Sequence, residues 1–425
     1  MEPDLIINDL KYKKNTKFYD LARVPKKVGP LMRFLEKIII HFLRFGQSRS
    51  ITKINMETLG PRDVFLTLCN HTTLMDLVVG IDIMFPRTIH YLMSIEGLSV
   101  FPYKLFEAGG VFCKRRFNSD VSIVRVFKKL VSSNQLVGLF PEARFSVTGE
   151  LSSIPTSTGK ICKYLGIPVV VMLFHGHYLV EPNWGNGKRR KLPIHCEQKL
   201  ILTKEQVETM SVQQINEVIK KELYYNEWDY QKQNNILIKE DFRAEGLEKI
   251  LYKCPHCASE FVMSTHRTHL KCNNCGAEYL YHEDSHLECL NFPTIFTSIS
   301  DWLHWERKKV REEIEAGTYY YHEVLQTYAY PHPMNILDLG LVEVTHDLNG
   351  FKAKGRYNGA DFVFFKKPQQ NFSLQTEFSC RSFNRQDIFA FSTNNNTLFF
   401  IPHNPMVIQK LYFATEELYN IKCEK

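Results

Sequence analysis

The stretch VFLTLCNHTTLMDLVVGIDIMF, residues 64–85, combines a strand-like apolar run with a helix-like run directly behind it. Residues 64–69 are few, mostly apolar and followed by polar residues, which is typical of a buried strand. Thr73 and Asp76 have the spacing of a capping box in front of the second run, which predicts that a helix begins there. The stretch therefore reads as one strand-to-helix unit.

Similar units continue along the chain to about residue 205. The runs that read as strands are VFLTLC, TIHYLM, LVGLF and PVVVMLF, and helical patterns occur near 76–85, 119–132 and 157–165. Strands that alternate with helices favour a parallel sheet covered by helices. We therefore predict an α/β fold with a mostly parallel sheet flanked by helices.

The chain is too long for one compact domain, since 425 residues with 44% hydrophobic content predict roughly two to four units. We expect N-terminal amphipathic, membrane-associating helices at 1–50, the α/β domain at 51–250, a small zinc ribbon at 251–282, and a helix with a β-rich α+β domain of unknown role at 283–425. The strands and closing helix of the last segment resemble pleckstrin-homology-like modules in element order alone, which assigns no role.

Four cysteines have metal-ligand spacing. Cys254 and Cys257 form one CxxC pair, and Cys272 and Cys275 form a second. A CxxC turn directs two thiolates at one metal, and two such turns complete a tetrahedron. Gly276 follows the second pair and suits the positive φ that such turns often need. We predict structural zinc, with iron in a rubredoxin-like site as the alternative, and a ribbon whose folding depends on the metal.

Residues 30–46, PLMRFLEKIIIHFLRFG, have apolar residues at helical spacing on one side and basic residues on the other. Two interpretations stay open: a helix that docks on its own domain, or an interfacial helix on a membrane. A formal net charge of +7 suits an anionic partner such as a lipid surface. The cations expected to contact anionic phospholipids are Lys26, Lys27, Arg33, Lys37 and Arg44.

No stretch reaches the roughly 18 uninterrupted apolar residues of a spanning helix, and no secretory signal is visible. The 11 cysteines would be hard to explain as disulfides in such a protein, and four of them have metal-ligand spacing. We therefore expect a cytoplasmic protein, peripheral on the inner face of the cell membrane.

His71 and Asp76 allow two interpretations. In the first, Asp76 only caps the helix and His71 is a loop residue. In the second, His71 stands at the carboxyl end of a strand, where open α/β sheets place their sites, and Asp76 turns back toward the imidazole. A carboxylate on one ring nitrogen fixes the tautomer and raises the basicity of the other, which makes a general base for a hydroxyl.

Four segments, in order, resemble the sequence blocks of the glycerophospholipid acyltransferases, which acylate glycerol 3-phosphate and lysophosphatidate. NHTTLMD matches their NHxxxxD block, GGVFCKRR their GxxFxxR block, FPEARFS their FPEGTRS block, and GIPVVVMLF their proline-containing apolar strand. The first block alone is weak, but the ordered set over roughly residues 60–180 is specific. The resemblance implies an O-acyltransferase of phospholipid synthesis.

The resemblance also implies the chemistry of the pair. His71 would be the general base that removes the proton of the acceptor hydroxyl, and Asp76 would orient the ring and stabilise its imidazolium. The hydroxyl would attack the thioester of an acyl-CoA or acyl-carrier protein. The implied acceptor is a lysophosphatidate-like lipid, with another lysophospholipid or a glycolipid as the alternative.

Substrate-binding residues are implied by the other three blocks. The matching positions are Gly109, Phe112, Arg115, Glu142 and Pro168. FPEARFS departs from FPEGTRS because its arginine, Arg144, stands one position earlier, and Arg144 stays a candidate contact. Recognition of the acceptor phosphate is therefore expected to depend mainly on Lys114, Arg115 and Arg116.

A non-catalytic binding protein is the competing class of function, in which the zinc ribbon and the basic charge would engage nucleic acid. No basic stripe interleaved with aromatic residues surrounds the cysteines, and HLECLNF just behind them is not cationic. We therefore expect a membrane surface, a lysophospholipid acceptor and an acyl donor as partners, and no nucleic acid.

Overall fold

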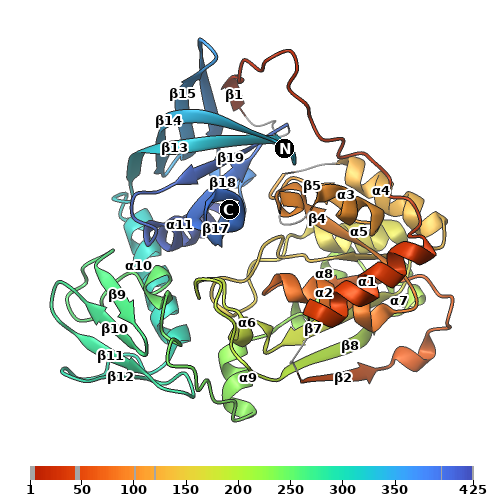
Figure 1. Ribbon diagram of the computed structural model, residues 1–425, viewed down its shortest axis with the longest axis horizontal. Coiled ribbons are helices and arrows are strands. Elements are labelled where there is room, and N and C mark those ends of the chain that lie inside the picture. The colour runs from red at the N-terminus through yellow and green to blue at the C-terminus, as the bar shows by residue number, and fades with distance from the viewer. Residues whose placement is uncertain (1–4, 44–47, 100–101, 119–120, 394, 424–425) are drawn as a thin grey trace.

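The computed structural model describes residues 5–43, 48–99, 102–118, 121–393 and 395–423. Figure 1 shows an α/β domain at the right, a small ribbon of strands at the lower left, and a β-rich part above the ribbon. Arg44, one of the expected lipid-binding cations, lies outside the described residues.

A seven-stranded sheet forms the centre of the α/β domain. Its strands, in spatial order, are β2 (Arg49–Ile54), β8 (Ile194–Leu202), β7 (Val169–His175), β3 (Leu66–Cys69), β6 (Leu136–Leu139), β4 (Ile89–Ser94) and β5 (Phe112–Lys114). Each neighbouring pair is parallel except β7 and β8, which run antiparallel. The prediction of an α/β fold with a mostly parallel sheet is therefore confirmed.

Helices cover both faces of this sheet (Figure 1). Along β7, Val170 and Met172 belong to one buried cluster and Val171 to another, because neighbouring side chains point to opposite faces. The helices of this domain are α1 (Pro30–Leu43), α2 (Leu74–Met84), α3 (Tyr103–Ala108), α4 (Val121–Ser132), α5 (Ser157–Leu165), α6 (His177–Val180), α7 (Lys204–Thr209), α8 (Val212–Glu222) and α9 (Glu227–Gln233). In the described chain, every helix is too short or too polar to cross a bilayer.

The cysteine-rich segment folds as a small antiparallel sheet. Its four strands, in spatial order, are β12 (Leu287–Cys289), β11 (Glu278–Tyr281), β10 (His269–Cys272) and β9 (Met263–His266). The fourth strand, β12, lies beyond residue 282, so this sheet extends past the end expected for the ribbon.

Short 3-10 helices occur elsewhere in the chain: η1 (Met56–Thr58), η2 (Ile95–Ser99), η3 (Leu247–Lys249), η4 (Pro368–Gln370) and η5 (Arg381–Phe383).

The C-terminal part is an antiparallel sheet, preceded in the chain by the long helix α10 (Ile299–Glu315) and followed by the long helix α11 (Val407–Cys423). Its own strands are β13 (Tyr321–His332), β14 (Asn335–Asp347), β15 (Gly350–Tyr357), β16 (Ala360–Lys366), β17 (Gln375–Cys380), β18 (Gln386–Ser392) and β19 (Thr397–Ile401). The spatial order of the whole eight-stranded sheet is β1-β16-β15-β14-β13-β19-β18-β17. The expected β-rich character of this part is therefore confirmed.

The first strand of that sheet, β1 (Leu5–Asn8), comes from the other end of the chain. It pairs antiparallel with the edge of β16, with Leu5 opposite Phe365. Within residues 5–43 and 48–50, the part of this segment that the structure describes, only α1 is helical, contrary to the expectation of helices across residues 1–50. The run LIIN, with its two β-branched residues, suits an extended strand on an open sheet edge.

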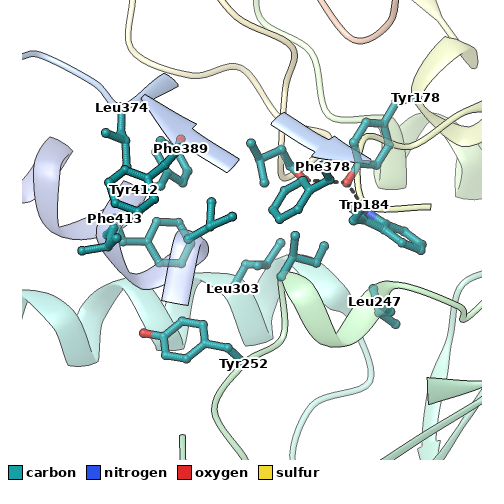
Figure 2. Packing of buried hydrophobic residues seen from close by; sticks show 14 of the residues in the cluster. Tyr178, Trp184, Leu247, Tyr252, Leu303, Leu374, Phe378, Phe389, Tyr412 and Phe413 are labelled. Atoms are coloured by element: carbon teal, nitrogen blue, oxygen red, sulfur yellow. Dashed lines mark hydrogen bonds between the residues drawn. The ribbon is translucent and has the colours of Figure 1, made fainter. Parts of the chain in front are cut away.

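Buried aromatic residues join the three parts of the molecule (Figure 2). Tyr178 and Trp184 of the α/β domain, Tyr252 before the ribbon and Tyr412 of α11 belong to one continuous buried cluster. The Trp184 indole donates to the Tyr178 hydroxyl at 2.8 Å, and that hydroxyl donates to the Val147 carbonyl at 2.8 Å. The loops at the carboxyl end of the sheet therefore have the C-terminal part as an immediate neighbour.

Candidate active site and metal centre

His71 lies in the turn between β3 and α2, at the carboxyl end of a central strand. Its Nδ1 is 3.1 Å from Oδ2 of Asp76. The His71 side chain is 17% exposed, whereas the Asp76 side chain is fully buried. One ring nitrogen of His71 is therefore committed to a carboxylate, and Nε2 is the nitrogen left for a substrate at this end of the sheet.

Asp76 serves the helix and the histidine together. Thr73 caps α2 by accepting the backbone N–H of Met75 at 3.1 Å, and Asp76 Oδ2 accepts the N–H of Thr73 at 2.9 Å. The N–H of Thr72 donates to the same carboxylate oxygen. Both interpretations of this stretch are present in one geometry, because the capping box holds the carboxylate where it meets the ring of His71.

The pKa shifts of the pair suit a base. Burial lowers the pKa of the His71 imidazole from its ordinary 6.5, Asp76 opposes this shift, and the charge of Arg116 lowers the pKa further. Burial alone would raise the pKa of the Asp76 carboxyl, but hydrogen bonds from His177 and His71 hold that pKa below its ordinary value. At neutral pH the pair is therefore a neutral imidazole beside a carboxylate.

Two phenylalanine rings flank His71. The Phe140 ring is stacked on the imidazole, with centroids 4.0 Å apart, and the Phe145 ring is tilted against it at 4.4 Å. Both belong to FPEARFS, and the N–H of Ser146 in that segment donates to the His71 carbonyl at 2.7 Å. The third block is therefore wrapped around the histidine, with Phe145 at the position that is arginine in FPEGTRS.

Glu142 is buried, and its carboxylate accepts hydrogen bonds from the protein. Oε1 accepts the backbone N–H of His71 at 3.1 Å and the Tyr225 hydroxyl at 3.2 Å. Oε2 accepts the backbone N–H of Ser152 at 3.0 Å, and burial raises the pKa of Glu142 to about 6. In this structure Glu142 anchors the backbone of His71, and its expected contact with substrate stays a prediction.

Arg115 is turned into the C-terminal part. Its side chain is buried, and both terminal nitrogens of the guanidinium donate hydrogen bonds across the junction. The acceptors are the carbonyls of Tyr330, Pro331 and Asn395 and the hydroxyl of Thr397. This guanidinium is therefore occupied by protein acceptors here, and the phosphate contact expected of it stays a prediction.

Arg144 and Arg116 lie in different surroundings. Arg144 is buried beneath α11 and forms an ion pair with Glu416 at 3.1 Å. Arg116 forms an ion pair with Glu377 at 3.2 Å and is the arginine whose charge acts on His71. Arg116 is therefore the expected cation that the fold brings near the base, whereas Arg144 is part of the domain junction.

The remaining expected substrate-binding residues lie in or beside the sheet. Phe112 is buried in β5, and Lys114 ends the same strand, half-buried. Gly109 follows α3, where an added Cβ would come within 3.0 Å of the Glu36 carboxylate. Pro168 precedes β7, and its carbonyl accepts a backbone N–H from β3 at 2.9 Å. Contact of these residues with substrate stays a prediction.

The sequence pattern does not identify His177, the first residue of α6. Its Nδ1 lies 2.5 Å from Oδ1 of Asp76, and its side chain is buried. A signal for it does exist, because His177 follows the carboxyl end of β7 just as His71 follows that of β3. In a parallel sheet, residues behind neighbouring strands meet at one edge.

Cys254, Cys257, Cys272 and Cys275 converge at one point. Their Sγ atoms all lie within 4.8 Å of one another. Gly276 has a φ of 78°, in the left-handed region expected behind the second pair. Four thiol donors from two CxxC turns at these separations fit a tetrahedral metal ion.

Part of the chain is similar to known proteins. The model of the Acyltransferase family matches residues 50–174, which run from β2 to β7 and include His71 and Asp76. No curated protein sequence matches the chain. Among solved structures, the chain is similar to the 1-acyl-sn-glycerophosphate (LPA) acyltransferase PlsC from Thermotoga maritima, with 16% identity, 45% of this chain and 77% of that chain covered, and a TM-score of 0.34. The match to the Acyltransferase family thus covers residues 50–174, less than a third of this chain, and includes the turn that carries His71 and Asp76.

Proposed function

We propose that the chain transfers a fatty acyl group from acyl-CoA or acyl-carrier protein to the hydroxyl of a lysophosphatidate-like acceptor. The observation that carries the proposal is the hydrogen bond between Nδ1 of His71 and the buried Asp76, inside a domain of the Acyltransferase family. That bond orients the ring and leaves Nε2 as the base. Another lysophospholipid or a glycolipid is the alternative acceptor.

The reaction has two steps. Nε2 of His71 takes the proton of the acceptor hydroxyl while the oxygen bonds to the thioester carbonyl carbon. The tetrahedral intermediate then breaks its C–S bond, and the imidazolium gives the proton to the leaving thiolate, so that an ester and a free thiol result. Asp76 stabilises the imidazolium between the steps, and Phe140 and Phe145 hold the ring against rotation.

Arg116 is the residue assigned to the acceptor phosphate. Its charge already acts on His71, and a guanidinium matches a phosphate with two parallel hydrogen bonds. In this structure it is paired with Glu377. Binding of a lysophosphatidate would place the phosphate on Arg116 and the hydroxyl near His71.

The exposed face of α1 is assigned to the membrane surface. Ile40 is buried, so one side of the helix docks on its own domain. The other side exposes large apolar side chains: Leu31, Phe34, Leu35, Ile38 and Phe42. Arg33, Lys37 and His41 line a surface groove together with Phe34, Ile38 and Phe42. An apolar face with a basic rim suits the interface of an anionic bilayer, here the cytoplasmic face.

The four-cysteine site is assigned to a structural Zn²⁺. The ion would be held by Cys254, Cys257, Cys272 and Cys275 and would cross-link the ribbon. Four thiolates fill a tetrahedral coordination sphere, so the site supports the fold and takes no part in acyl transfer.

The test offers labelled acyl-CoA and acyl-carrier protein to the purified full chain, with phosphorylated and unphosphorylated lipid acceptors. His71→Ala is expected to lower kcat by about a thousandfold or more, because the base is lost. The control is His322→Ala, which removes an exposed histidine on β13 and is expected to keep full activity.

Two results would overturn parts of the proposal. Turnover by a folded His71→Ala variant at the rate of the control would exclude His71 as the base. Product formed only with unphosphorylated acceptors would exclude the lysophosphatidate-like acceptor and the role of Arg116.

A further inference from the structure

His177 shares the carboxylate that orients the base. Oδ2 of Asp76 faces His71, and Oδ1 of the same carboxylate accepts a hydrogen bond from Nδ1 of His177 at 2.5 Å. Because an ionised carboxylate only accepts, the ring nitrogen is the donor in this bond. The two imidazoles therefore bind the two oxygens of one buried group.

The fold holds His177 firmly in this place. Its ring is stacked on Phe174 with centroids 5.3 Å apart. Gly176 before it has a φ of 81°, and its N–H donates to the buried carboxylate of Glu227 at 2.7 Å. An added Cβ at Gly176 would lie 2.5 Å from the Pro193 carbonyl, so the turn requires glycine.

Nε2 of His177 is buried and has no hydrogen-bond partner among the described residues. A buried polar group without a partner costs free energy, so packing alone would favour an apolar ring at this position. Among the described residues, the one polar contact of the His177 side chain is with Asp76. Its presence is therefore explained by what it does to that carboxylate.

We propose that His177 is a positioning residue, which acts through Asp76 to set the orientation and the basicity of His71. This inference rests on the proposed function. The hydrogen bond from His177 fixes the rotation of the carboxylate so that Oδ2 meets the ring of His71. It also draws charge from the carboxylate and so limits how far Asp76 raises the basicity of His71.

Other groups near Asp76 do not replace this role. Besides His71, the charge of Asp76 affects the pKa of Cys69, Tyr91, Glu181, Cys196 and Tyr225. The thiols and phenols among them stay neutral because burial raises each pKa. Glu181 is paired with Arg189 at 3.2 Å. Glu142 accepts the backbone N–H of His71, and the charge of Arg116 acts on the imidazole.

The experiment compares His177→Phe, which keeps a ring without a donor, with His177→Asn, which keeps a donor. In His177→Phe we expect kcat to fall roughly tenfold to a hundredfold with little change in KM, as for other outer partners of a functional group. The midpoint of the acid limb of kcat/KM should rise, because Asp76 is freed to support protonated His71. His177→Asn should recover most of both effects.

The matched control is His175→Phe. His175 lies two residues earlier, stacks on Tyr230 and makes no contact with Asp76 that the structure records. A merely structural histidine would lower stability in both variants without moving the acid limb. The inference is overturned if His177→Phe and His175→Phe have the same kcat and the same acid limb.

A second measurement needs neither turnover nor a stable variant. In the full chain labelled with ¹⁵N-histidine, His177 is expected to carry its proton on Nδ1 with a low-field shift, as hydrogen bonds to carboxylates produce. A proton on Nε2 alone would overturn the inference even if acyl transfer is found. A chain with the Nδ1 proton but no acyl transfer would instead refute the proposed function and leave the His177–Asp76 contact standing.

Discussion

At the scale of single residues, Asp76 determines the state of the base. Its carboxylate accepts hydrogen bonds from the imidazoles of His71 and His177 and from the N–H groups of Thr72 and Thr73. These bonds keep the carboxylate ionised although it is fully buried, since burial alone would raise its pKa. The charge that stabilises an imidazolium is thus present before substrate arrives.

The activity should therefore depend on pH through His71. Burial lowers the pKa of its imidazole below 6.5, so the neutral, basic form is present at pH 7 and is lost as pH falls through that lowered pKa. We expect the acid limb of kcat/KM to have its midpoint below pH 6.5. The measurement uses an acceptor without a titrating phosphate, and a midpoint above 6.5 would contradict the assignment.

At the scale of elements, α1 and α11 differ in how their apolar residues are distributed. In α1 they gather on one side, as in an amphipathic helix, whereas in α11 they occur all around the helix. Accordingly α11 is buried along most of its length, with Gln409, Thr415 and Glu416 inside. α1 leaves Phe34 and Phe42 exposed.

The exposed face of α1 predicts a defined loss of membrane binding. The double variant Phe34→Ser and Phe42→Ser should bind anionic vesicles more than tenfold more weakly, because burial of each ring contributes roughly 1.5–3 kcal/mol. The midpoint of thermal unfolding should be the same as in the unchanged chain. Leu341→Ser removes an equally exposed side chain from β14 and serves as the control. Equal vesicle binding by the two variants would refute the assignment.

The ribbon predicts a metal dependence of stability. Cys272→Ser, or a strong chelator, should remove the ion and lower the thermal midpoint of the whole chain, because the ribbon shares a continuous core with α10 and α11. Cys423→Ser changes an exposed cysteine at the end of α11 and should have no effect. Elemental analysis should find one zinc per chain in the control. The site would be excluded if the control contained no metal and had the same thermal midpoint as Cys272→Ser.

At the scale of the whole molecule, buried charges join the α/β domain to the C-terminal part. Arg144 pairs with Glu416 at 3.1 Å, and Arg307 of α10 donates to Glu416 at 2.5 Å. Burial alone would raise the pKa of Glu416, but Arg307 and Arg144 hold it below its ordinary value. Two arginines thus depend on one carboxylate inside the junction.

Removal of that charge should destabilise the chain strongly. Glu416→Gln leaves Arg144 buried without its counter-charge, and we expect a loss of about 3–5 kcal/mol in the free energy of unfolding. Glu315→Gln breaks the exposed pair with Arg311 and should change stability by less than about 1 kcal/mol. Chemical denaturation measures the free energy of unfolding of both variants. Equal denaturation midpoints of Glu416→Gln and Glu315→Gln would show that the charge of Glu416 does not stabilise the junction.

The junction also marks the limit of what the sequence could predict. The parallel sheet, the capping box at Thr73 and the two CxxC turns follow from local patterns, and the structure has them. The partner of a buried charge is not a local property. The motif FPEARFS does not predict that Arg144 pairs with Glu416, and the run KRR does not predict that Arg115 donates to Thr397 of β19. The role of His177 could not be predicted for the same reason, since its partner Asp76 lies on another strand-to-helix turn.

The pairing of β1 with β16 makes the order of synthesis matter. The ribosome synthesises Leu5 long before Phe365, so the first strand stays unpaired while the α/β domain folds. Until then the late-formed sheet offers a bare edge to neighbouring polypeptides. A chain shortened by its first eight residues would keep that edge open permanently, and its tendency to aggregate would report how much those few residues protect.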